Sequence, residues 1–467
     1  MTNKKYEETE ASLHTLANCV DPLLINAAGC WRLISKDHAW ALFQSRISAD
    51  ALNRFAPLAI EILVDDDPKF DLPDDKRAFA NIYGHTPVFS PIVKKHVAET
   101  LALLGTFGES LAAASNTSIP ATLAQVVQQI LNPNATWHRW ATLGIRLAML
   151  AEASPRDFIN SVRAELAKDN SEFKQLLDDN GADTMFNGCK HAGLLWALEL
   201  LAWPKTYLHD AATVLMELAK IDPGGKWCNR PMSSLNGIFL HWIPHTTAKV
   251  EERTQVLDRL IEHDSETSWR LLVSLLPQHL GHSAPAQQPY WRDWANDWVR
   301  GSTRKESIEF CNAVAARVVN QAGTIPERWK KVFENVGRFP FDSRKSLLNA
   351  AHQFADTELS EENRRKLSEI LFEHIHRHRS HPDADWSIPE EVLLELDKVL
   401  DKLQPNVASI RQAWLFKPYP DRFFRDGDVA KSEEMLKEAR ASAIAEILRE
   451  EGWEAVSYTH LTLPTKA

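Results

Sequence analysis

The sequence predicts an all-α protein, an irregular α-solenoid of stacked helical hairpins. Apolar residues recur at helical spacing along most of the chain, only 17 of its 467 residues are glycine, and no segment of strand length alternates apolar with polar residues. An all-β fold needs many tight turns and that alternating pattern. Aliphatic and aromatic residues make up 44% of the chain, which is enough for a large core.

The clearest hairpin lies in the middle of the chain. Residues 191–203 read HAGLLWALELLAW, and Pro204 breaks this helix before residues 207–221 begin the next. Residues 222–225 (DPGG) then end the second helix. A pair of this size, roughly thirty residues, corresponds to one unit of an α-solenoid. The apolar stripe of the first helix consists of Leu194, Leu195, Leu198 and Leu201.

Other helices follow the same logic. Ser154-Pro155 begins one, with a capping serine and a proline in the first turn. Ser360 begins another, which runs to residue 377 and carries acidic residues in its first turn. The remaining expected pairs are 250–263 with 266–276 and 325–336 with 342–355. The expected loops are 65–75, 106–118, 222–233, 281–289 and 381–389.

The pattern also predicts the domain organisation. Residues 1–18 are expected to form a polar N-terminal helix, and residues 19–280 the first part of a helical-repeat array. Residues 281–289 are the expected linker to a second part, residues 290–455. The last twelve residues, 456–467 (VSYTHLTLPTKA), resemble translated sequencing-adapter sequence and are interpreted as a non-native tail.

Charge, the character of the N-terminus and cysteine content indicate which partners and which cellular location to expect. The chain has 63 acidic and 53 basic residues, a net charge of −10, which argues against a nucleic-acid duplex as partner. The N-terminus is too polar for a signal peptide, and no apolar run reaches the ~20 residues of a membrane span. A cytoplasmic location is therefore expected, with reduced thiols because no cysteine lies in a C-x-x-C pair. The cysteines are Cys19, Cys30, Cys189, Cys228 and Cys311.

A glycine-containing loop is the first candidate site. Residues 222–226 (DPGGK) could place consecutive backbone N–H groups around an anion. The spacing of a phosphate-binding loop is absent, Trp227 stands where that motif has a hydroxyl, and the loop follows a helix. The loop is better interpreted as a helix stop than as a nucleotide site.

The histidine cluster near residue 378 is the strongest candidate for chemistry. His374 and His378 are four residues apart on one helix face and could share a zinc ion, with Asp383 or Asp385 completing the shell. A metal-dependent hydrolase using this cluster is the alternative function. Interleaved arginines oppose a bound cation, and basic residues also suit a helix C-terminus. A second pair gives a weaker signal: His279 and His282.

A tryptophan stripe offers a third candidate. Trp291, Trp294 and Trp298 stand at i, i+3 and i+7, which predicts one face of a helix. Such a stripe could stack RNA bases, but Asp293 and Asp297 next to it would repel phosphates. Packing between neighbouring hairpins is the favoured interpretation. The same interpretation holds for Trp137 and Trp140.

No catalytic arrangement emerges from the residues. The carboxylates at 65–67 and 74–75 lie in proline-bracketed loops and are expected to be solvated, whereas a catalytic pair needs a pocket that separates its pKa values. Walker, G-x-G-x-x-G and G-x-S-x-G motifs are absent. The sequence therefore predicts no catalytic, cofactor-binding or metal-ligating residue, and no cofactor.

Several segments together resemble a family of very large bacterial proteins in which a long helical region, TPR- or HEAT-like, follows an NTPase module. This family is similar to the STAND-type NTPases of antiphage defence. The resemblance spans most of residues 20–455. The matching segments are 65–68 (DDDP) with 70–73 (FDLP), 99–104 (ETLALL), 193–203 (GLLWALELLAW), 221–225 (IDPGG) with 229–231 (NRP), 269–272 (WRLL) and 378–386 (HRSHPDADW).

The resemblance implies a sensor or scaffold region that binds a protein partner, without catalytic activity of its own. Stacked hairpins expose a long concave surface suited to this task. Neither an NTPase nor an effector domain is present in this sequence, so no upstream activity transfers to these residues. The chain is expected to be a fragment, with self-association through the ends of the truncated array.

Overall fold

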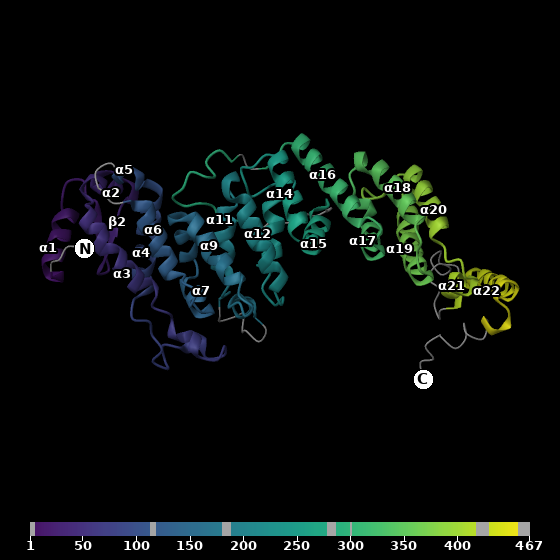
Figure 1. Ribbon diagram of the computed structural model, residues 1–467, viewed down its shortest axis with the longest axis horizontal. Coiled ribbons are helices and arrows are strands. Elements are labelled where there is room, and N and C mark those ends of the chain that lie inside the picture. Colours follow the sequence, from purple (N-terminus) through teal and green to yellow (C-terminus); the bar gives the residue numbers. More distant parts are fainter. Residues whose placement is uncertain are drawn as a thin grey trace. The chain divides into compact units, whose positions relative to one another are not determined.

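A computed structural model describes residues 5–112, 118–179, 188–277, 286–298, 301–416 and 429–455. Over these ranges the chain forms 22 α-helices and one two-stranded sheet (Figure 1). The prediction of an all-α fold is confirmed. None of the helices in these ranges is long and apolar enough to cross a membrane. The expected tail, residues 456–467, lies outside the described residues.

The chain divides into two compact units. The first comprises Met1–Leu271 with Ser283–Thr303, and the second comprises Leu272–His282 with Arg304–Ala467. Of the linker expected at 281–289, the structure describes residues 286–289. These residues belong to the first unit, together with the segment that follows them up to Thr303.

The first unit is built mainly from helices, of which α8 (Arg146–Ala153) packs most extensively, on α4 (Pro91–Phe107) and on α11 (Ala192–Leu201). Residues 191–203 and 207–221 form the expected hairpin, with the leucine stripe fully buried. The helices are α1 (Tyr6–Ala17), α2 (Lys36–Phe43), α3 (Ala49–Leu63), α4 (Pro91–Phe107), α5 (Glu109–Ala112), α6 (Ile119–Ile130), α7 (Trp137–Leu143), α8 (Arg146–Ala153), α9 (Pro155–Leu166), α10 (Phe173–Leu177), α11 (Ala192–Leu201), α12 (Lys205–Ile221), α13 (Pro231–Ile238), α14 (Val250–His263) and α15 (Ser265–Leu275), the last of which runs into the second unit.

Two glycines allow the central helices α4, α8 and α11 to approach closely. A Cβ atom at Gly105 would lie 2.3 Å from the carbonyl oxygen of Ala153, at the end of α8. A Cβ atom at Gly193 would lie 2.0 Å from the carbonyl oxygen of Gly144, just before α8. Both distances are far below van der Waals contact, so only glycine fits at either position.

A short β-hairpin near the N-terminus was not predicted. Strands β1 (Leu24–Ala27) and β2 (Cys30–Leu33) pair antiparallel, with Ala28 and Gly29 in the turn at positive φ. The side chain of Asn26 accepts a hydrogen bond from the Gly29 N–H, which stabilises this turn. Four-residue strands are too short for an alternating pattern to stand out, so the turn residues were the only signal.

In the described residues, the second unit contains seven more helices, and its aromatic core lies among the earlier ones. The last two, α21 (Ala408–Gln412) and α22 (Val429–Glu451), pack around a separate cluster of Leu415, Leu436 and Ala443. Trp329 is buried and stacks on Phe354, with ring centroids 4.8 Å apart. Ser360 caps its helix by accepting a hydrogen bond from the Asn363 N–H, as the sequence predicted. The helices are α16 (Arg304–Ala322), α17 (Pro326–Glu334), α18 (Phe341–Ala355), α19 (Glu361–Arg379), α20 (Glu390–Leu403), α21 (Ala408–Gln412) and α22 (Val429–Glu451).

Candidate functional site

Between α3 and α4 the chain makes an excursion, residues 65–90, which we call the finger. Figure 1 shows it in blue, projecting away from the ends of these two helices. Two short 3₁₀ helices shape it, η2 (Pro68–Asp71) and η3 (Arg77–Phe79). The finger includes two of the segments that carry the family resemblance, 65–68 and 70–73.

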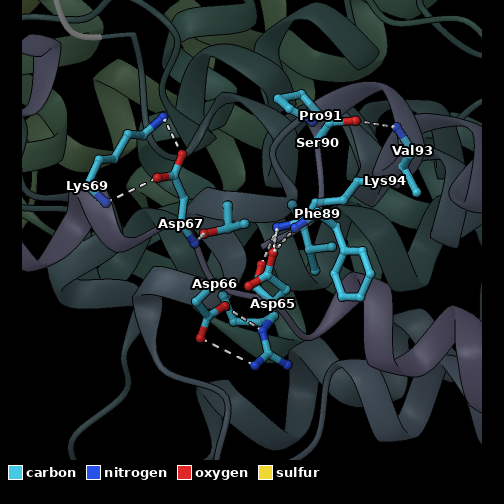
Figure 2. A network of polar contacts seen from close by, with 12 residues as sticks. Asp65, Asp66, Asp67, Lys69, Phe89, Ser90, Pro91, Val93 and Lys94 are labelled. Carbon is cyan, nitrogen blue, oxygen red and sulfur yellow. Dashed lines mark hydrogen bonds and ion pairs between the residues drawn. The ribbon is translucent and has the colours of Figure 1, made fainter. Parts of the chain in front are cut away.

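Asp65 joins the two ends of the finger. Its carboxylate lies 2.8 Å from Nζ of Lys94 on α4 and accepts a hydrogen bond of 3.0 Å from the Phe89 N–H (Figure 2). Burial raises the pKa of Asp65, but the hydrogen bonds from Lys94 and Phe89 outweigh it and hold the pKa below its ordinary value. The carboxylate is therefore charged at neutral pH and ties the start of the finger to its end.

The next two aspartates fasten the base of the finger to α7. The carboxylate of Asp66 pairs with the guanidinium of Arg139, at 2.6 and 3.3 Å. The backbone N–H of Asp67 donates to the Thr142 hydroxyl at 2.8 Å. The Asp67 carboxylate accepts from the Lys69 N–H and pairs with its Nζ, both at 3.1 Å (Figure 2).

The expectation that residues 65–67 are solvated is therefore wrong. All three carboxylates are paired, and two of their partners are distant in sequence, with Lys94 29 residues and Arg139 73 residues away. No local pattern could have identified these partners. Asp74 likewise pairs with a basic residue, Arg77, whereas Asp75 is exposed as expected.

An aromatic cluster packs against the finger. Phe70 is buried and meets the ring of Trp137 edge to face, with centroids 5.4 Å apart. The guanidinium of Arg77 lies 5.3 Å from the centroid of Trp137 and donates to the Leu72 carbonyl at 3.0 Å. Trp137 therefore packs against η2 and η3 of the finger, whereas packing between neighbouring hairpins was expected.

The second half of the finger, residues 79–88, exposes large apolar side chains, and we call it the tip. Four of them are at least half exposed: Phe79 (50%), Ile82 (79%), Tyr83 (53%) and Val88 (82%). Six aspartates and three basic residues lie within the finger, so its overall charge is negative. The finger thus exposes several large apolar side chains, while ion pairs hold four of its six aspartates.

The histidine cluster of the second unit brings two imidazoles together. Nε2 of His378 lies 2.9 Å from Nε2 of His374, and Nδ1 of His378 accepts from the Ile388 N–H at 3.1 Å. His378 therefore carries its proton on Nε2 and donates it to His374. Asp383 and Asp385 are exposed, and neither contacts the pair. The hydrolase alternative expected a carboxylate beside these histidines, and the structure brings together only the imidazoles.

Burial, together with neighbouring positive charge, lowers the pKa of both His374 and His378 to about 4. In the unfolded chain a histidine binds a proton near pH 6.5, so the unfolded state takes up protons first as the pH falls. We expect the second unit to lose about 3 kcal/mol of stability for each of these two histidines between pH 7 and pH 4, at about 1.4 kcal/mol per pKa unit. Urea unfolding followed by tryptophan fluorescence at several pH values measures this loss. A His374→Gln, His378→Gln variant with the same pH profile as the parent would contradict the assignment.

The DPGG loop does hold an anion, but the anion is the chain's own carboxylate. Helix α12 ends at Ile221, as predicted, and the N–H groups of Lys226 and Trp227 then donate to the two oxygens of Asp179, at 3.2 and 3.1 Å. A Cβ atom at Gly225 would lie 1.4 Å from the same carboxylate, which explains the glycine. The loop is therefore a structural element.

Arg230 completes this buried cluster. Its guanidinium pairs with Asp179 at 2.7 Å and Asp222 at 3.0 Å, and also donates to the Leu177 carbonyl at 2.8 Å. Burial raises the pKa of Asp179, but the Trp227 N–H and the charge of Arg230 outweigh it, so the pKa stays below its ordinary value. The cluster links the end of α10 to the loop after α12.

A cysteine and a histidine meet beside this cluster, which sequence spacing did not indicate. Sγ of Cys189 lies 3.2 Å from Nε2 of His191, and that nitrogen lies 2.8 Å from the Asn229 carbonyl oxygen. Burial raises the pKa of the Cys189 thiol and lowers the pKa of His191. Both groups are therefore uncharged at neutral pH, which is the opposite of an activated thiolate–imidazolium pair.

The tryptophan segment, residues 286–298, differs from its prediction, because it forms turns and not a helix. We call it the strap. Its backbone N–H groups at Tyr290, Trp291 and Arg292 donate to the buried carboxylate of Glu152 on α8, at 2.9, 2.7 and 2.9 Å. A helix would use these donors internally, so the buried acceptor decides the local conformation. Glu199 on α11 accepts similarly from the strap's Gln287 N–H at 3.3 Å.

The strap's tryptophans nevertheless pack, as the favoured interpretation predicted. Trp298 meets Trp203 edge to face at 5.0 Å, and its indole N–H donates to the Pro244 carbonyl at 3.0 Å. Trp294 lies 5.7 Å from the ring of Tyr207 on α12. These rings contact the chain's own residues and cover the ends of α11 and α12.

The described part of the chain contains no group of three or more His, Cys, Asp or Glu residues placed to hold a metal ion. His279 and His282 lie outside the described residues. Comparison with protein-family models, with curated proteins and with solved structures found no match to this chain. Among the candidate sites in the described residues, the finger exposes the most large apolar side chains.

Proposed function

We propose that this chain is a non-catalytic protein-binding region, a sensor or scaffold segment of a large cytoplasmic bacterial protein linked to an NTPase of antiphage defence. The tip of the finger carries the protein-binding part of this proposal. It exposes four large apolar side chains, while ion pairs and buried aromatic residues fix its base. Exposed apolar patches surrounded by polar residues are typical of interaction sites.

The finger also favours one kind of partner. Because four of the finger's six aspartates are already paired with lysine or arginine and its tip is apolar, the complementary surface is an apolar hollow. A base held by three aspartates keeps the tip in one conformation, so binding costs little ordering entropy. A partner that binds one conformation of a stacked array of hairpins more tightly than another could shift the conformational equilibrium of an attached NTPase.

The link to an NTPase rests on the family resemblance of the finger and of the segments farther along the chain. Sequencing of the source DNA upstream of codon 1 and beyond codon 455 tests it. We expect the reading frame to continue into further helical repeats, with a Walker motif upstream. A frame confined to these residues would leave a stand-alone helical adaptor and remove the NTPase from the proposal.

Charging the finger tip should abolish partner binding. Ile82→Asp combined with Val88→Asp removes two apolar side chains from the contact and places charges in a surface that must be desolvated. We expect affinity to fall by about a hundredfold or more. Site-specific photo-crosslinking from position 83, with the full chain expressed in bacteria, measures the loss of a discrete protein adduct.

A matched control is available in the second unit. Leu394 on α20 is 52% exposed, similar to the tip residues, but stands alone among charged neighbours. Leu394→Asp should leave the adduct intact, and a crosslinker at position 394 should give none. Equal adducts from positions 83 and 394, or an adduct that survives the double substitution at the tip, would contradict binding through the finger.

A further inference from the structure

Residues 381–389, the loop between α19 and α20, lie against the histidine pair of the second unit, and we call them the flap. The Ile388 N–H donates to Nδ1 of His378 at 3.1 Å, and the Ser387 hydroxyl donates to the His378 carbonyl oxygen at 3.1 Å. The ring of Trp386 meets the imidazole of His378 edge to face, with centroids 5.2 Å apart. One histidine thus holds three consecutive residues of the flap.

The backbone of the short 3₁₀ helix η4 (Val336–Arg338) also lies against the pair. A Cβ atom at Gly337 would lie 3.2 Å from Nε2 of His378 and 3.7 Å from Nε2 of His374. His378 is only 4% exposed. The imidazoles are therefore closely packed as well as hydrogen-bonded, so neither ring can turn to a new partner unless its neighbours move.

Both nitrogens of the pair that could take up a proton are already acceptors of hydrogen bonds. Nδ1 of His378 accepts from the Ile388 N–H, and Nε2 of His374 accepts from the Nε2–H of His378. A proton on Nδ1 of His378 would set two N–H groups against each other and break the bond to the flap. A proton on Nε2 of His374 would break the bond between the rings in the same way. No form of the pair with an extra proton keeps both bonds.

The charges that act on the pair add to this conflict. The guanidinium of Arg377 on α19 and that of Arg344 on α18 both lie near enough to His378 for their positive charge to oppose a second cation there. The exposed His381 of the flap is different, because its Nδ1 donates to the Arg377 carbonyl at 3.1 Å and its Nε2 can bind a proton without loss of that bond.

Acidic side chains do not compensate for these charges. In the part of the chain that the structure describes, no carboxylate contacts either imidazole of the pair, and Asp383 and Asp385 of the flap are exposed. The helices that pack on α19 are α17, α20 and α21, and their charged side chains form ion pairs elsewhere. These pairs are Glu334 with Lys331 on α17, Glu390 and Asp397 of α20 with Arg379, and Arg411 of α21 with Glu446.

We propose that the flap is a proton-operated device, which is closed on the histidine pair at neutral pH and opens when the pair takes up a proton. Opening separates residues 386–388 from α19, while helices α19 and α20 keep hold of the two ends of the flap. It releases the ring of Trp386 from His378 and leaves a charged imidazole beside the guanidinium of Arg377. The second unit thereby changes the surface that it exposes in response to acid.

The test is hydrogen exchange of the flap in the full chain, followed by mass spectrometry between pH 7 and pH 5. Rates are divided by those of a free peptide with the sequence of residues 381–389 at each pH, which removes the intrinsic effect of pH on exchange. Each pH unit below the ordinary histidine pKa of about 6.5 favours the open form up to tenfold for each proton bound. We expect protection of the flap to fall at least tenfold, while α17 and α18 stay protected.

His374→Gln combined with His378→Asn should remove this response. The amide oxygens of glutamine and asparagine lie close to the positions of Nε2 and Nδ1, accept hydrogen bonds and do not titrate in this range. The flap of this variant should be as protected at pH 5 as at pH 7. His376→Gln is the matched control, because His376 lies on the same helix two residues from each member of the pair, and it should keep the full response.

Protection of the flap that stays constant between pH 7 and pH 5 in the parent chain would overturn the inference. An unchanged response in the double variant would overturn it too, since the response would then arise from other groups. Loss of protection that includes α17 and α18 would show unfolding of the whole unit and would contradict a local opening. If the double variant does not fold, His374→Gln alone keeps the bond to Ile388 with one titrating imidazole, and its response should be weaker than that of the parent; an equal response would count against the pair.

Discussion

Replacing Glu152 by glutamine should release the strap and cost the first unit about 3 kcal/mol. The buried carboxylate accepts three backbone N–H groups of residues 290–292. An amide keeps one acceptor oxygen but directs an NH₂ group at the remaining donors, which leaves buried N–H groups without partners. Each such group costs about 1–3 kcal/mol.

Hydrogen exchange of the strap amides measures this effect directly, with urea unfolding as the stability readout. In the Glu152→Gln variant we expect fast exchange at 290–292 and earlier proteolytic cleavage within the strap. Glu334→Gln, which alters an exposed ion pair with Lys331, is the control and should change stability by less than about 1 kcal/mol. Unchanged protection of the strap in the Glu152 variant would contradict its role.

Removing either partner of the Asp179–Arg230 pair should be comparably damaging. Each single substitution, Asp179→Asn or Arg230→Met, leaves a buried charge without its main partner, and we expect each to cost about 3–5 kcal/mol. Arg230→Met also removes the ion pair to Asp222 and the bond to the Leu177 carbonyl. The loop after α12 should then lose its attachment to α10.

The double variant separates the interaction energy of Asp179 with Arg230 from the other costs of each substitution. Since Asp179→Asn with Arg230→Met leaves neither of these two charges, its cost should fall short of the summed single costs by about 1–3 kcal/mol. Urea unfolding of the four proteins gives the coupling energy. Strictly additive losses would show that the two side chains act independently, contrary to the 2.7 Å contact.

Helices were predictable because their signals are local. The helix expected at 250–263 matches α14 (Val250–His263), and the one at 342–355 differs from α18 (Phe341–Ala355) by one residue. Apolar spacing, capping residues and helix stops all act within a turn or two of the chain. The same holds for the glycine-containing loop, whose role as a helix stop was evident from its residues.

The strap shows where local reasoning fails. Its tryptophans have helical spacing, but a carboxylate some 140 residues earlier in the chain takes the backbone donors that a helix would need. The finger gives the same lesson for charge. A run of aspartates in a loop is usually solvated, but here lysine and arginine side chains from α4 and α7 form ion pairs with it.

The candidate sites also differ in whether their signals are local in the sequence or depend on distant residues. His374 and His378 could be paired from their spacing on one helix, because i and i+4 side chains meet. The finger tip could not be predicted, because exposure depends on what the rest of the chain leaves uncovered.

The amino-acid sequence alone was therefore sufficient for the all-α class and for the positions of helices such as α11, α12, α14 and α18, since hydrophobic periodicity and helix caps are properties of neighbouring residues. The tertiary structure decided which carboxylates are buried, from which loop N–H groups they accept hydrogen bonds, and which apolar side chains remain exposed. Those outcomes depend on contacts between residues tens to more than a hundred positions apart, for which a single chain carries no local pattern.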